Sequence, residues 1–70
     1  MKPNYSRFES LLNEAGKNTA QIAAAVEIEQ STFTRWKAGD YYPKVEKLFK
    51  LANYFGVPVE YFYGGNDEAV

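Results

Sequence analysis

Residues 19–39 read TAQIAAAVEIEQSTFTRWKAG, and this stretch decides the fold. In its first part, Ile22, Ala23 and Val26 fall on one side of a helix, because residues one and four positions apart share a helical face. In its second part, Phe33 and Trp36 share a face because they lie three positions apart. We therefore expect two short amphipathic helices in this stretch.

Only the three residues 27–29 separate these two helical patterns. Two helices joined by so short a turn must cross at a steep angle, which is the helix-turn-helix arrangement. The outward face of the second helix is expected to be polar, with two cations, and to consist of Gln30, Ser31, Thr32, Thr34, Arg35 and Lys37. Such a face is either simply solvated or contacts another molecule.

The composition restricts the classes of function. A chain of 70 residues forms one domain, and a domain of this size buries only about 60% of its unfolded surface. The chain has no Cys and no His, which excludes disulfides and removes the commonest metal ligand and general base. No convergent carboxylate pair suggests catalysis either. We expect no metal, no cofactor, no small-molecule ligand and no enzymatic activity.

No apolar run approaches the roughly 20 residues that span a bilayer, and no signal-type leader is evident. We expect a soluble cytoplasmic protein that does not bind membranes. The net charge of −1 argues against a general polyanion binder. However, residues 1–59 contain all the basic residues and carry net +2, while residues 60–70 carry net −3. The body of the chain is therefore mildly positive.

Helix signals cover most of the remaining chain. We predict helices over about 5–15, 19–26, 30–38, 44–55 and 59–63, with a loose lead-in at residues 1–4. Gly16 and Gly56 should end two of them, Asn18 should cap the second in a capping box with Gln21, and Ser6 with Glu9 has capping-box spacing in the first. The predicted domain is 1–64, followed by a disordered acidic tail at 65–70. The expected inward faces comprise Phe8, Leu11, Leu12 and Ala15, then Val45, Leu48, Leu51, Ala52 and Phe55, then Phe62.

The ordered pattern over about residues 5–64 resembles the phage-repressor-like (Xre/Cro) helix-turn-helix domains. The matching residues are Ala15-Gly16, Ile22-Ala23, Val26, Ile28, the run 31–36 (STFTRW), Gly39, Pro43, Leu48, the run 51–57 (LANYFGV) and the run 60–64 (EYFYG). The resemblance implies an all-α, five-helix, lambda-repressor-like DNA-binding domain. In such a domain the helix over about 30–38 enters the DNA major groove.

The resemblance also assigns contacts by position. The base contacts would be made by Gln30, Ser31, Thr34 and Arg35, and the phosphate contacts by Asn18, Thr19, the backbone near Glu29, Lys37, Tyr42 and Lys44. The chemistry suits these roles, because Gln can bond adenine N6 and N7 together and Arg can bond guanine O6 and N7 together. Lys47 and Lys50 are interpreted as a solubilising face, whereas Phe33 and Trp36 are expected in the core.

Four positions depart from the family pattern. Glu27 stands where Gly is common, Glu29 stands where Ser or Thr usually caps the next helix, and Thr19 replaces a frequent Gln. Leu12 and Lys37 together replace an Arg and a Glu that can form an ion pair. We predict that Leu12 packs against the stem of Lys37 or the ring of Trp36. The two glutamates make the corner that would meet DNA more acidic than usual.

A domain of this size reads few base pairs, and members of the family generally bind two-fold symmetric sites as dimers. The expected homodimer surface comprises Val57, Val59, Tyr61 and Tyr63, with Tyr54 beside them; the alternative is that these side chains only cover the edge of the core. The chain is either a short regulator or the head of a longer repressor. The predicted function is a sequence-specific regulator of double-stranded DNA, of the phage or mobile-element repressor type. The alternative is a protein-interaction module, antirepressor-like or antitoxin-like, that uses the same fold.

Overall fold

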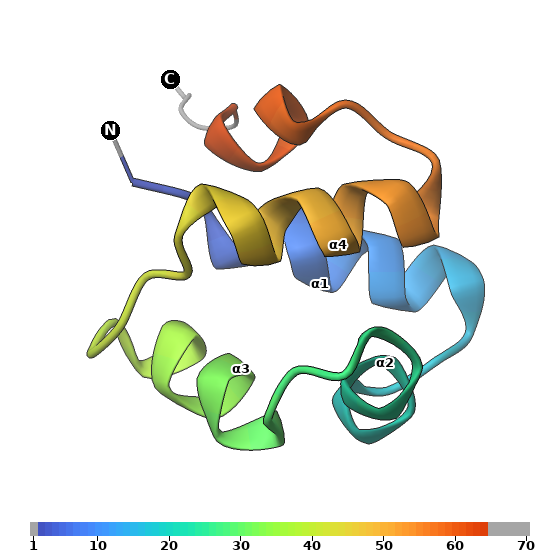
Figure 1. Cartoon of the computed structure of the whole chain (residues 1–70), viewed down its shortest axis with the longest axis horizontal. Helices are drawn as coiled ribbons and strands as arrows, with labels where there is room; N and C mark the ends of the chain where they lie inside the picture. The colour runs from blue at the N-terminus through green and yellow to red at the C-terminus, as the bar shows by residue number, and fades with distance from the viewer. Residues whose placement is uncertain (1, 65–70) are drawn as a thin grey trace.

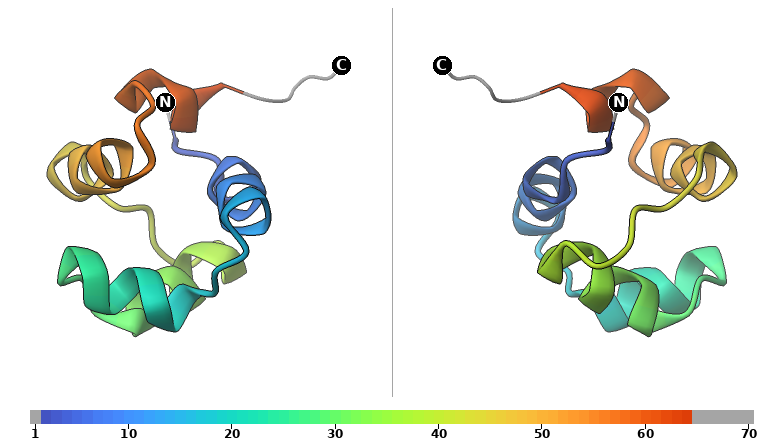
Figure 2. Two further views of the ribbon diagram at one scale, coloured as in Figure 1. Left: turned by 90° about the vertical axis from the view of Figure 1, so that its right-hand side faces the viewer. Right: turned by 90° about the vertical axis from the view of Figure 1, so that its left-hand side faces the viewer.

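A computed structural model describes residues 2–64 of the chain. It contains four α-helices and one short 3-10 helix: α1 (Tyr5–Ala15), α2 (Thr19–Val26), α3 (Gln30–Ala38), α4 (Val45–Phe55) and η1 (Val59–Tyr63). In Figure 1, α1 and α4 overlap in projection, with α2 and α3 below them. Figure 2 shows that α1 and α4 lie on opposite sides, with η1 across the top and α2 and α3 across the bottom. The five elements therefore surround one core.

Local signals set most of the helix ends. α1 ends at Gly16, whose φ of +66° is left-handed and whose N–H donates to the carbonyls of Leu12 and Asn13. α2 begins at Asn18, where the predicted capping box with Gln21 is present. The predicted bounds of α1, α2 and α3 are confirmed. α4 begins one residue later than predicted, with Lys44 as its N-cap.

Aromatic rings from three elements meet in the centre of the core. The ring of Phe8 in α1 stacks on Phe33 with centroids 4.8 Å apart and lies 5.5 Å from Trp36. Phe62 of η1 also lies near Trp36, with ring centroids 6.4 Å apart. These contacts fix the inner side of α3, and they confirm that Phe33, Trp36 and Phe62 are buried. The remaining buried apolar residues are Leu11, Leu12, Ile22, Ala23, Ile28, Leu48, Leu51 and Ala52.

The segment before α1 is not the loose lead-in that we predicted. Pro3 is buried, and its carbonyl accepts a hydrogen bond of 3.2 Å from Trp36 Nε1. Asn4, rather than Ser6, is the N-cap of α1, and its Oδ1 accepts from the backbone N–H of Ser6. The backbone N–H of Asn4 donates to the carbonyl of Phe62 at 2.6 Å. This segment is therefore hydrogen-bonded both to α3, through Trp36, and to η1, through Phe62.

Two further predictions need correction. The fifth predicted helix is a 3-10 helix, as is common for so short a segment between Pro58 and Gly64. Ala15 and Val45 are exposed rather than inward, because each is a terminal residue of its helix and extends past the core. The predicted acidic tail at 65–70 lies outside the described residues. Within residues 2–64, no helix is both long and apolar enough to cross a membrane.

Candidate nucleic-acid interface

The turn between α2 and α3 consists of Glu27, Ile28 and Glu29. Glu27 has left-handed backbone angles, with φ 59° and ψ 46°, as its place in the family pattern suggested. Ile28 is buried, and its N–H donates to the carbonyl of Ala23 at 3.0 Å. Both carboxylates are exposed, and Glu29 caps α3 without a side-chain hydrogen bond. A buried isoleucine therefore holds a tight turn whose outer surface is acidic.

The outer side of α3 is polar, with one exception to the prediction. Gln30, Ser31, Thr34, Arg35 and Lys37 are exposed. Thr32, which we predicted to face outward, is only 7% exposed. It lies one helical turn before Trp36 and therefore shares the buried face. The four predicted base-contact residues thus lie together on the solvent side of α3, where their role stays a prediction.

The starts of α2 and α3 lie next to each other. Gln30 Nε2 donates to Thr19 Oγ1 at 3.4 Å, which joins a predicted base-contact residue to a predicted phosphate-contact residue. Asn18 uses its Oδ1 in the capping box, which leaves its Nδ2 as the side-chain donor for a phosphate. The N-terminal amides of α2 carry the positive end of the helix dipole, which attracts anions.

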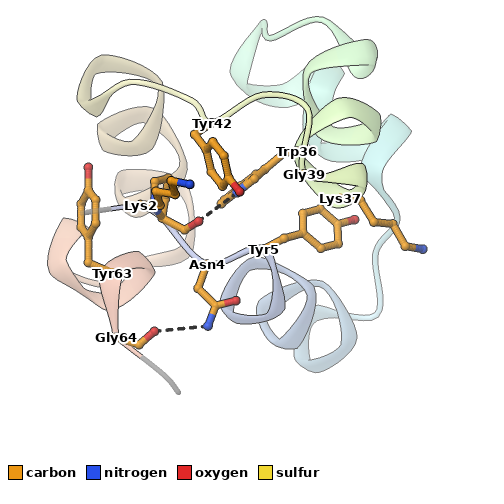
Figure 3. A pocket seen from close by; sticks show the side chains of 10 residues that line it. Lys2, Asn4, Tyr5, Trp36, Lys37, Gly39, Tyr42, Tyr63 and Gly64 are labelled. Atoms are coloured by element: carbon orange, nitrogen blue, oxygen red, sulfur yellow. Dashed lines mark hydrogen bonds between the residues drawn. The ribbon is translucent and has the colours of Figure 1, made fainter. Parts of the chain in front are cut away.

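The other predicted phosphate contacts lie around the C-terminal end of α3. Lys37, Tyr42 and Lys44 are all exposed. The ring of Tyr42 has Lys2 Nζ 5.0 Å from its centroid. Figure 3 shows Lys2 and Tyr42 side by side in a pocket, whereas Lys37 points away from both. All three residues line this pocket.

A second groove lies between α1 and α3. Leu12 and Lys37 both line it, together with Phe33 and Thr34, and Leu12 also belongs to the core cluster that contains Trp36. The contact predicted between Leu12 and Lys37 or Trp36 stays a prediction. Tyr5 lines the same groove, and its burial, assisted by the Glu9 carboxylate, raises the pKa of its hydroxyl.

Sequence reasoning missed one cluster beside α3. Arg35 Cζ lies 5.6 Å from the ring centroid of Tyr41, and Lys47 Nζ lies 5.3 Å from the same centroid. Lys47 Nζ also donates to the Tyr41 hydroxyl at 3.3 Å. The only signal in the sequence is that Tyr41 follows the glycine that ends α3. That signal places Tyr41 in a loop without showing what its ring contacts.

The predicted dimer surface is only partly exposed. Val57, Val59, Tyr61 and Tyr63 are half-buried against the core. The guanidinium of Arg7 lies 4.7 Å from the ring centroid of Tyr61. More apolar surface is exposed on α4, where Val45 and Phe49 are 45% and 51% exposed and one helical turn apart, and where Tyr54 is exposed as well.

Comparison with known proteins supports this reading of the fold. Residues 8–62 match the family model HTH_3, described as helix-turn-helix. The chain is 30% identical over 54 residues to the cryptic phage CTXphi transcriptional repressor RstR of Vibrio cholerae, an alignment that covers 77% of this chain and 49% of the repressor. The chain thus spans about half the length of that relative.

A solved structure gives the same result. A transcriptional regulator from Listeria innocua superposes with a TM-score of 0.75 at 25% identity, covering 100% of this chain and 66% of the regulator. The matched family consists of transcriptional regulators and not of enzymes. From the family match over most of its length and the agreement of the fold, the chain belongs to the Xre/Cro-type helix-turn-helix family.

Proposed function

We propose that this chain is a sequence-specific regulator of double-stranded DNA, a repressor of the phage type, that reads the major groove with α3. One observation carries the proposal. α3 has its inner side fixed by Phe33 and Trp36 and its outer side lined by exposed side chains that suit base edges, and it follows a three-residue turn. The likeness to a phage repressor supports the regulatory role.

In this proposal, base recognition and phosphate contact fall to different residues. Gln30, Ser31, Thr34 and Arg35 contact base edges, with Arg35 suited to guanine and Gln30 to adenine. Asn18, Thr19 and the backbone at Glu29 contact one stretch of phosphates. Lys37, Tyr42 and Lys44, at the other end of α3, contact another. Contacts on both sides of the groove would orient α3 along it.

The chain would bind as a homodimer on a two-fold symmetric operator, because one domain of this size covers few base pairs. The surface offered for pairing is η1 with its flanks, namely Val57, Val59, Tyr61 and Tyr63. Sedimentation with and without DNA tests this point, and strictly monomeric binding to an asymmetric site would contradict it.

Selection from random DNA sequences with the purified chain tests the main proposal. We expect an enriched, symmetric site, and binding that weakens with salt in proportion to the phosphates contacted. Arg35→Ala and Gln30→Ala should each lose discrimination at one base position, by about tenfold to a hundredfold. Lys50→Ala, which removes one exposed positive charge from α4, is the matched control and should leave discrimination unchanged.

A second candidate function rests on the acidic corner. Exposed carboxylates at Glu27 and Glu29 would face the phosphates in the first proposal, and they would suit a basic protein surface instead. If the selection enriches no sequence, the chain is better explained as a protein-interaction module of the same fold.

A further inference from the structure

The loop after α3 turns back against the helix that precedes it. The backbone N–H of Asp40 donates to the carbonyl of Arg35 at 2.9 Å, and Gly39 N–H bonds the same end of the helix. This bond brings the next residue, Tyr41, alongside Arg35. In this arrangement the guanidinium of Arg35 lies 5.6 Å from the ring centroid of Tyr41.

The Tyr41 ring is also held from a second helix. Lys47 of α4 lies over the ring and donates a hydrogen bond to its hydroxyl. Tyr41 is half-buried, whereas Arg35 is exposed. The ring of Tyr41 is thus held by a second helix, whereas the Arg35 side chain is exposed.

We propose that Tyr41 is a positioning residue that holds the Arg35 guanidinium ready to contact a base. A guanidinium that lies over an aromatic ring uses its flat face, whereas guanine O6 and N7 are recognised by its N–H edge. The two contacts can therefore exist together. Arginine has a long, flexible side chain. A contact that restricts this side chain in the free protein reduces the conformational entropy that is lost on binding.

This inference rests on the proposed role of Arg35 in base recognition. Its first test therefore uses the free protein. In the NMR spectrum, the ring current of Tyr41 should shift the side-chain resonances of Arg35, and Tyr41→Leu should return them to ordinary values. Tyr41→Phe keeps the ring and should keep the shift. Unshifted Arg35 resonances in the unaltered chain would overturn the inference whether or not the chain binds DNA.

The second test measures binding to the selected operator and to the same site altered at the base that Arg35→Ala shows to be read. Tyr41→Leu should reduce discrimination at that base by about twofold to fivefold, the range expected for an exposed cation–π contact. Tyr41→Phe should largely restore it. In the Arg35→Ala background, Tyr41→Leu should have no further effect on discrimination.

Tyr42→Leu is the matched control, because it removes the neighbouring tyrosine, which contacts Lys2 and not Arg35. It should weaken binding to both sites equally. A loss of discrimination from Tyr41→Leu that persists without Arg35, or that Tyr42→Leu reproduces, would overturn the inference. Failure to enrich any DNA sequence would overturn the proposed function and this role with it, while a normal ring-current shift would show that the contact itself exists.

Discussion

The two short connections on either side of α2 have the same length and opposite character. Before α2, Gly16 takes the left-handed position and Asn18 closes a complete capping box. After α2, Glu27 takes the left-handed position and Glu29 begins α3 without a side-chain cap. The first connection uses the residues that stabilise such a turn most, whereas the second uses residues that stabilise it less.

The difference shows where the chain departs from the most stable choice. The second connection is the turn of the helix-turn-helix motif, and it lies at the end of α3 that carries Gln30 and Ser31. Glu27 has a strained backbone there, and such strain often occurs at functional sites. The first connection therefore favours stability, whereas the second has less favourable residues at the end of α3 that carries two of the predicted base contacts.

The largest effect is expected at the first connection. Gly16→Ala should lower the free energy of unfolding by about 1–2 kcal/mol, because a side chain at φ +66° is strained although nothing lies within 4 Å of its Cβ. Thermal unfolding followed by circular dichroism measures the change, which corresponds to about 4–8 °C in Tm for each kcal/mol. An unchanged Tm would mean that the glycine is not needed there.

The second connection should respond with the opposite sign. Glu27→Gly should raise the free energy of unfolding by up to about 1 kcal/mol. The glycine removes the backbone strain of a left-handed glutamate, but it also increases the conformational entropy of the unfolded chain, which offsets part of the gain. Glu27→Gln removes the charge and keeps the strain, so its stability should stay close to that of the unaltered chain. Denaturation by urea would separate the two variants. If only Glu27→Gln gains stability, the charge of Glu27, and not its backbone strain, lowers the stability of the unaltered chain.

The smallest effect is expected at Glu29. Glu29→Ser should add a hydroxyl cap to α3 and stabilise the fold by roughly 0.5 kcal/mol. If the proposed function holds, the same variant should bind its operator about threefold more tightly at low salt, because one carboxylate no longer repels phosphate. Added salt should reduce this gain. Weaker binding of Glu29→Ser at low salt would instead show that the carboxylate makes a favourable contact.

The architecture was predictable because its signals are local. Gly16, Asn18 and Gln21 mark helix ends by their own chemistry, and the stripe from Leu48 to Ala52 repeats with the period of a helix. The three-residue turn needs no distant contact to be inferred. Periodicity also placed Phe33 and Trp36 inward correctly.

Two kinds of feature were not predicted. The first are contacts between segments that are far apart in the sequence or that depend on a loop. The second is a residue whose polarity and position on its helix indicate opposite sides. The bond from Trp36 to Pro3 joins residues 33 positions apart, and no local pattern predicts it. Thr32 was placed outward because it is polar, although its position one turn before Trp36 directs it inward. The contact of Arg35 with Tyr41 depends on how the loop after α3 turns back.

The hydrogen bond from Asn4 to the carbonyl of Phe62 brings the two ends of the described chain together, and Asn4 Nδ2 adds a bond of 3.4 Å to the carbonyl of Gly64. The first and last described segments are thus neighbours, as the adjacent dark blue and orange-red segments in Figure 2 show. Domains with adjacent ends tolerate circular permutation when the new break falls in an exposed loop. In this fold, a short linker between the two ends would add a covalent connection to the hydrogen bonds of Asn4, and α3 would keep its neighbours.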